Sequence, residues 1–150
     1  MHNFVESSGS TNDDDGIRIE LAPNNVVQHN DSRLNRHDGV HLVAAVGALV
    51  ADNVLVHNGT PGAGNGCGID VDSLTVAGVT TPSTGNTVTN NVAREHTCSG
   101  IRVRNSLSNT VANNHLKDNP GDGILLTNGD NNNGGEGRLA EPALTEPAAS

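Results

Sequence analysis

The chain has 150 residues, a length typical of a single domain, and a formal net charge of -9 at pH 7. This acidic balance excludes a protein that grips the nucleic-acid backbone with clustered Lys and Arg, and we expect no nucleic-acid partner. Phe4 is the only Phe, Tyr or Trp, which excludes a core built on rings and disfavours a platform that stacks sugars. No stretch reaches the ~20 apolar residues of a membrane span, so we expect none.

The first recurring element is a Gly followed by alternating apolar residues. Its copies are GIRIE, GVHLV, GIDVD, GIRVR and GILLT, which begin at Gly16, Gly39, Gly68, Gly100 and Gly123. Residues i and i+2 of a strand point to one face, so the apolar pairs should stack inside. These pairs are Ile17/Ile19, Val40/Leu42, Ile69/Val71, Ile101/Val103 and Ile124/Leu126. The Gly is expected to supply the positive φ of a tight corner.

Two Asn markers follow each of the first four Gly strands. The first marker comprises Asn25, Asn53, Asn86 and Asn109, and the second, five residues later, comprises Asn30, Asn58, Asn91 and Asn114. The spacing from the Gly to the first marker is 9, 14, 18 and 9 residues, which predicts insertions after the Gly strands of the second and third units. Stacked Asn side chains form amide ladders, so we predict that each marker forms one ladder.

Three markers in a fixed order, with a shortest period of 23 residues, predict a solenoid whose coils bury their apolar faces against one another. We therefore predict an all-β, single-stranded parallel β-helix of about four to five coils, with Asn ladders at its turns. The repeat domain should span residues 15–130. A polar lead-in or remnant coil is expected at 1–14 and a flexible polar tail or linker at 131–150.

The stretches NTVTNN, SGIRV and NTVANNHLKDNPGDGILL resemble the repeats of right-handed parallel β-helix proteins. These form the pectate-lyase-like superfamily, and the resemblance is especially to the Asn-rich repeats shared by periplasmic copper-processing proteins and carbohydrate-binding or sugar-hydrolase domains. It implies a right-handed helix, as does the crossover preference of parallel strands. It does not specify a function, because the superfamily includes lyases, hydrolases, epimerases and non-catalytic surface proteins.

The outward positions of the Gly strands form two polar columns. The first column reads Arg18, His41, Asp70, Arg102 and Leu125, and the second reads Glu20, Val43, Asp72, Arg104 and Thr127. Adjacent coils lie ~4.8 Å apart, so neighbours within a column touch. The simplest interpretation is a solvated face on which opposite charges stabilise the stack. The alternative is a site for a sugar polymer.

Under the alternative, Arg102 and Arg104 pair with the carboxylate of an acidic sugar. Arg18 and Glu20 are further candidate substrate-binding residues on the same face. The insertions predicted after the second and third Gly strands should form walls around this region.

The candidate catalytic residues on this face are His41, Asp70, Asp72 and Arg102. His41 is a candidate proton carrier. Asp70 and Asp72 are candidate Ca²⁺ ligands, and their expected separation of ~6.6 Å also suits the ~6.5–9.5 Å gap of an inverting hydrolase.

Two other pairs have chemistry of their own. His29 and His57 precede the second Asn marker and should stack, which makes them candidate ligands for a transition metal, with a solvated or ladder role as the alternative. Cys67 and Cys98 precede successive Gly strands and should meet at one corner. A disulfide, which implies an oxidising compartment, and two free thiols are equal alternatives.

The favoured function is a non-catalytic module of an extracellular, cell-surface or periplasmic protein that recognises or scaffolds polysaccharide. The alternative is a polysaccharide lyase, epimerase or hydrolase for acidic sugars, with calcium as its candidate cofactor, and copper processing is a distant third. Both ends lack a clear cap, so we expect a piece of a longer protein, with further coils or a second copy at the ends. Many acidic residues with one Lys fit either a salt-loving organism or a GC-rich genome.

Overall fold

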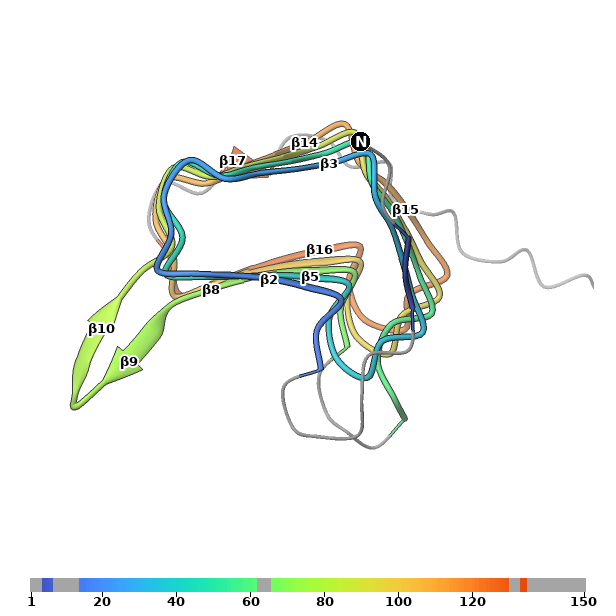
Figure 1. Cartoon of the computed structure of the whole chain (residues 1–150), viewed down its shortest axis with the longest axis horizontal. Coiled ribbons are helices and arrows are strands. Elements are labelled where there is room, and N and C mark those ends of the chain that lie inside the picture. The colour runs from blue at the N-terminus through green and yellow to red at the C-terminus, as the bar shows by residue number, and fades with distance from the viewer. Residues whose placement is uncertain (1–3, 7–13, 62–65, 130–132, 135–150) are drawn as a thin grey trace, which may run out of the picture.

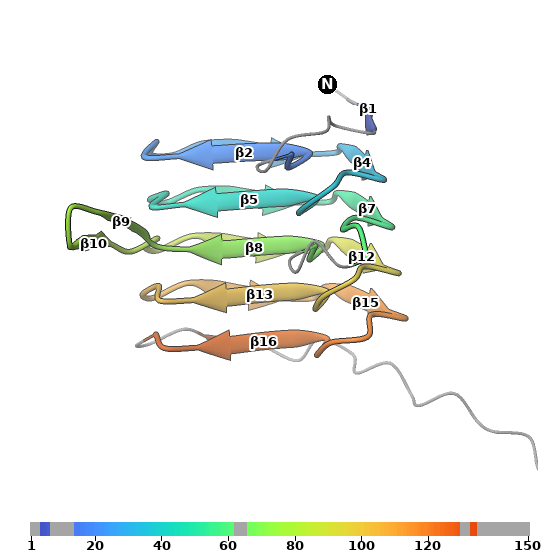
Figure 2. The same cartoon turned by 90° about the horizontal axis from the view of Figure 1, so that it is seen from below.

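The computed structural model describes residues 4–6, 14–61, 66–129 and 133–134. Within these ranges the chain winds in stacked coils of three short strands each, joined by narrow turns (Figures 1 and 2). The predicted all-β parallel β-helix is confirmed. Most of the predicted lead-in and tail lies outside the described residues. No helix with the length and apolarity of a membrane span occurs in the described part of the chain.

Sheet I contains the Gly strands in the order β16-β13-β8-β5-β2. Its strands are β2 Ile17–Glu20, β5 Val40–Val43, β8 Ile69–Asp72, β13 Ile101–Arg104 and β16 Ile124–Thr127. All neighbours pair in parallel, so the first predicted column, from Arg18 through Asp70 to Leu125, forms one row across the sheet. The in-register pairing therefore brings five coils' outward side chains into contact.

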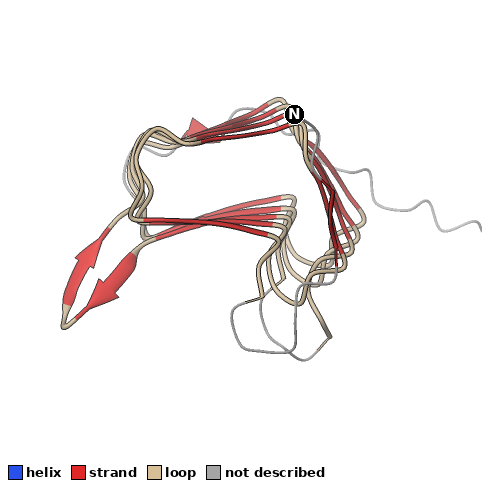
Figure 3. Ribbon diagram, in the orientation of Figure 1, coloured by secondary structure: helices blue, strands red, loops and turns tan. Residues whose placement is uncertain are grey.

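Sheets II and III complete each coil, and their strands also pair in parallel (Figure 3). Sheet II contains β3 Val26–Gln28, β6 Leu49–Ala51, β11 Thr87–Thr89, β14 Thr110–Ala112 and β17 Asn133–Gly134. Sheet III contains β1 Phe4–Glu6, β4 Asp31–Arg33, β7 Val54–Val56, β12 Val92–Arg94 and β15 His115–Lys117. Strands β1 and β17 thus extend the sheets beyond residues 15–130 at both ends.

The core is a thin column of aliphatic side chains between the sheets. The fully buried members from sheet I are Val40, Leu42, Ile69, Val71, Ile101 and Val103, as predicted. Each such side chain stabilises the fold by about 1.5–3 kcal/mol through burial. Exposure grows toward the ends of the stack: Ile17, Ile19 and Ile124 are only partly buried, and Leu126 is 38% exposed.

The corners of the coil turn on residues in the left-handed region of backbone space. One corner uses Asn24, Gly47, Gly85 and Ser108, the next His29, Asp52, Asn90 and Asn113, and the third Leu34, His57, Glu95 and Asp118. The Gly that precedes each strand of sheet I does not have a positive φ, so the expectation that it turns the corner is wrong. At Gly39 a Cβ would lie 2.7 Å from both Asn58 Nδ2 and the Gly68 carbonyl oxygen, so close packing of coils requires Gly there.

Asn ladders connect the coils, but one coil has a different register from the prediction. The middle ladder consists of Asn30, Asn53, Asn91 and Asn114. From Asn53 onward, each Oδ1 accepts the backbone N–H of the preceding rung at 2.9–3.0 Å. A second ladder consists of Asn25, Ala48, Asn86 and Asn109, and a third of Asn35, Asn58, His96 and Asn119.

The predicted grouping of Asn53 with Asn25 and of Asn58 with Asn30 is therefore wrong. Ala48 occupies the first ladder position of the second coil, and its N–H donates to Asn86 Oδ1 at 2.8 Å. Because the first ladder position of this coil has no Asn, the first Asn marker in the sequence falls on Asn53, which is five residues later and occupies the middle ladder. A ladder tolerates one Ala because the backbone N–H still finds an acceptor in the next coil.

The two insertions lie at different corners. The third coil contains the predicted extra residues after its Gly strand, as an antiparallel hairpin of β9 Leu74–Val76 and β10 Val79–Thr81 that projects from the solenoid (Figure 1). The second coil has no insertion there, contrary to the prediction. Its extra residues lie between Asn58 and Gly68. In the other coils, the Asn of the middle ladder is followed by the next Gly after 9 residues, whereas from Asn53 to Gly68 the step is 15 residues.

Candidate functional site

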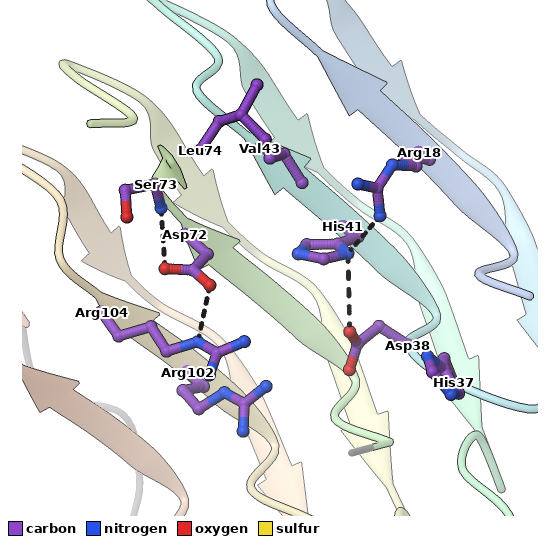
Figure 4. A pocket seen from close by; sticks show the side chains of 10 residues that line it. All are labelled: Arg18, His37, Asp38, His41, Val43, Asp72, Ser73, Leu74, Arg102 and Arg104. Atoms are coloured by element: carbon purple, nitrogen blue, oxygen red, sulfur yellow. Dashed lines mark hydrogen bonds and ion pairs between the residues drawn. The ribbon is translucent and has the colours of Figure 1, made fainter. Parts of the chain in front are cut away.

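A cavity of about 250 Å³ lies on the outer face of sheet I (Figure 4). Its walls come from the outward side chains of four Gly strands, the turn before β5 and the start of the hairpin. The lining residues are Arg18, His37, Asp38, His41, Val43, Asp72, Ser73, Leu74, Arg102 and Arg104. Five of the predicted site residues therefore meet in one pocket: Arg18, His41, Asp72, Arg102 and Arg104. Ser73 and Leu74 belong to the insertion after the third Gly strand and form one of the two predicted walls. The other predicted wall does not form, because no insertion follows the second Gly strand.

Asp70 is the buried centre of this charge cluster, with no exposed surface. Arg102 binds it with two hydrogen bonds, from Nε to Oδ1 at 3.0 Å and from Nη2 to Oδ2 at 2.7 Å. Arg104 Nη2 adds a third bond to Oδ2 at 3.2 Å. A bidentate guanidinium–carboxylate pair of this kind fixes both side chains, and losing Asp70 would leave the nearly buried charge of Arg102 without its partner.

Asp72 lies nearer the surface and shares Arg104 with Asp70. Arg104 Nε is 2.9 Å from Asp72 Oδ2, and the Ser73 N–H donates to Oδ1 at 2.7 Å. Because Arg104 contacts both carboxylates, they do not flank a space for the water of an inverting hydrolase. The two arginines predicted to bind a sugar carboxylate are thus already paired with carboxylates of the protein.

Arg18 is the remaining arginine of the pocket and is paired in the same way. Its Nη1 lies 3.1 Å from Asp15 Oδ2, and its Nε lies 2.9 Å from Glu20 Oε2. Glu20, a predicted substrate-binding residue, contacts Arg18 but does not line the pocket. All three guanidinium groups of the pocket therefore have carboxylate partners within the protein.

His41 links two halves of the cluster. Its Nδ1 lies 3.0 Å from Asp15 Oδ2, and its Nε2 lies 3.7 Å from Asp70 Oδ2. The Nε2 atom is buried and forms no hydrogen bond with any described residue. Burial by itself lowers the pKa of His41, but the hydrogen bond to Asp15 and the charges of Asp38 and Asp70 outweigh it and raise the pKa.

Asp38 lies beside His41 and is almost fully buried, with 3% of its side chain exposed. Its Oδ1 accepts the Cys67 N–H at 2.7 Å, and its Oδ2 lies 3.8 Å from His41 Nδ1. Burial and then the charge of Asp70 raise the pKa of Asp38 to about 7.

Asp15 and Asp38 were not among the predicted site residues. Both come directly before the Gly of a Gly strand, and that shared position was the available signal in the sequence. The pKa of Asp15 shifts in the opposite direction from that of Asp38. Burial alone would raise the pKa of Asp15, but its hydrogen bonds, led by the one to His41, outweigh burial and lower it.

Among the described residues, two overlapping groups have the atoms for a metal ion. Asp15, Asp38 and His41 place one ligand atom each within 4.8 Å of one another, and so do His41, Asp70 and Asp72. The predicted Ca²⁺ ligands Asp70 and Asp72 therefore share a cluster with His41. Both carboxylates are also held by Arg104, whose positive charge occupies the place of a cation between them.

Comparison with known families identifies the architecture. A family model described as a right-handed β-helix region matches residues 2–137. The chain belongs to this right-handed β-helix family. The match includes all the described coils of the β-helix and both end strands, β1 and β17. No curated protein matches the chain.

The predicted pair of histidine ligands does not form in this β-helix. His29 shares a row with Asp52, whereas His57 lies one corner further on, in a row with Leu34 and Glu95. His57 Nε2 is 2.6 Å from Glu95 Oε2. The stacked-histidine metal site is therefore wrong, for the same reason as the ladder grouping: the second coil is shifted by one corner relative to the predicted alignment.

Cys67 and Cys98 form a disulfide, with their Cα atoms 4.7 Å apart. The bond connects the turns that lead into β8 and β13. These strands carry Asp70 and Arg102, so the disulfide joins neighbouring coils of the β-helix directly beside the charge cluster. The sequence left this bond and two free thiols as equal alternatives.

Proposed function

We propose that the chain is a β-helix module that binds polysaccharide in the pocket on sheet I. The observation that carries the proposal is a polar cavity of about 250 Å³ in which Asp38 and His41 Nε2 have unused hydrogen-bonding capacity. Sugar hydroxyl groups both donate and accept hydrogen bonds, which matches a pocket of carboxylate, imidazole and guanidinium groups. Val43 and Leu74 supply an apolar patch for sugar C–H groups.

The size of the pocket favours one sugar unit of a longer chain. Its volume of about 250 Å³ is just below the ~300 Å³ at which sites for drug-sized ligands begin. The rest of a polysaccharide would run along the solvated face of sheet I, where outward residues of each coil repeat at ~4.8 Å. The β9–β10 hairpin closes one side of this path.

We also infer an oxidising location, at the cell surface, outside the cell or in a periplasm. The Cys67–Cys98 bond supports this inference, because disulfides persist in such compartments and are rare in a reducing cytosol.

A carbohydrate-active enzyme is the second candidate, and Asp38 favours it. Its carboxyl group has a pKa raised to about 7 by burial and by Asp70, and a group that titrates near neutral pH suits general acid–base catalysis. Asp38 together with His41 would exchange a proton with a bound uronic acid in a lyase or epimerase reaction.

The test is a calorimetric binding screen of neutral, acidic and amino oligosaccharides, with ultraviolet absorbance recorded for unsaturated products. We expect saturable binding that weakens about tenfold, or about 1.4 kcal/mol, in His41→Gln. His115→Gln is the matched control, because His115 is an exposed residue of β15 on sheet III. Product that disappears in His41→Gln would establish the enzyme instead. A folded chain that binds no oligosaccharide would refute both candidates.

A further inference from the structure

We propose that the pocket selects a cationic sugar, a polysaccharide unit that carries an ammonium group, and that Asp38 is the residue that binds this group. The inference rests on the proposed polysaccharide-binding function and adds the chemical class of the sugar. The inference excludes acidic sugars, which were the ligands predicted from Arg102 and Arg104 in the sequence.

The first step is the balance of charge around the pocket. The ion-pair cluster contains the carboxylates of Asp15, Glu20, Asp38, Asp70 and Asp72 and the guanidinium groups of Arg18, Arg102 and Arg104. Even when His41 is protonated and adds one positive charge, one carboxylate remains without a matching cation. A ligand with a negative charge would increase this excess, and a ligand with a positive charge would cancel it.

The second step identifies Asp38 as that carboxylate. Glu20 has a partner in Arg18, Asp15 in His41, Asp70 in Arg102 and Asp72 in Arg104. Within the described residues, Asp38 has one ion-pair contact, with His41 Nδ1 at 3.8 Å, and that nitrogen lies closer to Asp15 Oδ2, at 3.0 Å. No described residue donates a hydrogen bond to Asp38 Oδ2, although the side chain is only 3% exposed.

The third step is access to a ligand. Asp38 lines the pocket beside His37 and His41 (Figure 4). A buried carboxylate without a cation is unfavourable, because burial penalises its charged form. An ammonium group has three donors and a full positive charge, so it satisfies Oδ2 and cancels the charge in one contact. A neutral hydroxyl group supplies the hydrogen bond but leaves the charge.

The groups that face Asp38 determine how pH affects binding. They are His41 on β5, Asp70 on β8, Asp15 before β2, Arg102 on β13 and the Cys67 N–H. Because the pKa of Asp38 is raised to about 7, its carboxyl group is largely protonated in mild acid and cannot pair with an ammonium group there. Affinity for an amino sugar should therefore increase as the pH rises from mild acid toward neutrality, and should decrease again at the higher pH where the sugar's ammonium group loses its proton.

The experiment compares three trimers by calorimetry with the oxidised full chain: glucosamine, N-acetylglucosamine and galacturonic acid. At neutral pH we expect the glucosamine trimer to bind about tenfold more tightly than its neutral N-acetyl counterpart. Its affinity should fall about tenfold in mild acid, whereas that of the N-acetyl trimer should not change. This comparison uses the wild-type chain and so does not depend on the folding of a variant.

The matched variants are Asp38→Asn and Asp118→Asn. The first keeps an oxygen for the Cys67 N–H but removes the charge, and should eliminate the preference for the glucosamine trimer. The second lies in a turn of sheet III, with 56% of its side chain exposed and φ at 53°, where Asn is well tolerated, and should bind like wild type.

Several results would overturn the inference. If the N-acetyl or galacturonate trimer binds at least as tightly as the glucosamine trimer, polysaccharide binding stands and the selection of a cationic sugar is refuted. If Ca²⁺ alone binds and displaces the glucosamine trimer from wild type but not from Asp38→Asn, the site is a metal site. If no trimer binds to a folded chain, the proposed function falls and this inference falls with it.

Discussion

His96 shows how one side chain changes the chemistry of a ladder. It occupies the position that Asn35, Asn58 and Asn119 hold in the other coils. Its Nδ1 accepts the Asn58 N–H at 3.1 Å, and its own N–H donates to Asn119 Oδ1 at 3.1 Å. Only a neutral imidazole has an acceptor at Nδ1. Burial lowers the pKa of His96 to about 4, so this rung is intact at neutral pH.

The His96 rung should make the protein acid-sensitive. The pKa of His96 in the folded chain, about 4, lies below the ordinary histidine value of 6.5. As the pH falls below 6.5, the unfolded chain binds a proton that the folded chain does not, so stability is lost progressively toward pH 4 and not regained below it. Across this window, wild type should lose about 3 kcal/mol more unfolding free energy than His96→Asn, as measured by urea denaturation.

The exposed His29 provides the control for this measurement. His29 and Asn90 occupy equivalent left-handed corners, so His29→Asn preserves the turn and should follow the wild-type pH dependence. Parallel curves for wild type and His96→Asn would contradict the role assigned to the rung.

The ladders stabilise the stack because each rung satisfies backbone groups of two coils. Asn91 is fully buried, and its Nδ2 lies within hydrogen-bond distance of the carbonyl oxygens of Val50 and Thr89 and of Asn114 Oδ1, each at 3.0 Å. Its Oδ1 accepts the Asn53 N–H at 3.0 Å. An Ala at this position would leave several buried groups without partners, each of which costs about 1–3 kcal/mol.

Asn91→Ala should therefore lower the unfolding free energy by about 3 kcal/mol or more, measured by urea denaturation. Asn25→Ala is the comparison, because Asn25 stands at the end of its ladder, half-buried, with one hydrogen bond to the Pro23 carbonyl at 3.3 Å. That change should lower it by less than about 1 kcal/mol. Equal effects of the two substitutions would refute the distinction between inner and terminal rungs.

The disulfide joins two coils that hydrogen bonds already hold side by side. It closes a loop with a sequence separation of 31 residues, for which the chain-entropy relation gives about 3–4 kcal/mol. The double variant Cys67→Ser, Cys98→Ser should lose this amount in urea denaturation. Dithiothreitol should produce the same loss in wild type and no change in the variant. A reductant effect on the variant would show that the loss comes from elsewhere.

The molecule as a whole has a thin core and a strongly acidic surface. Its small aliphatic side chains fit between sheets that are closed by narrow turns, and its formal net charge is -9. Like charges distributed over a folded chain repel one another and weaken the compact state. Salt shortens the range of this repulsion, to about 3 Å at 1 M.

We therefore expect the thermal midpoint to rise by about 3–5 °C, equivalent to about 1 kcal/mol, between 0.1 and 1 M NaCl. The cluster around Asp70 should not reverse this trend, since buried pairs are screened less than exposed charges. Circular dichroism against temperature measures the midpoint. A midpoint that falls with salt would mean that exposed ion pairs outweigh the net repulsion.

Much of the fold is predictable because it repeats. The alternation in segments such as Ile69–Val71 and Ile101–Val103 determines which face is buried, and repetition aligns the coils without knowledge of the structure. The prediction fails at Ala48, where one missing Asn moves the alignment of the second coil by a corner. The position of Asp38 directly before its Gly is visible in the sequence, but that position does not reveal its role in the pocket, because the role depends on partners from other coils.

The sequence alone specifies the parallel β-helix, its inner stack and the column from Arg18 to Leu125, because a regular strand period dictates which residues face inward and which face outward. The tertiary structure decided that Cys67 and Cys98 are bonded, that His29 and His57 do not stack, and that each pocket arginine has a carboxylate partner. These outcomes depend on distances between coils and on burial, which a one-dimensional pattern does not contain. Charge compensation is a property of the assembled cluster, and it is the basis of our proposal that Asp38 binds a ligand.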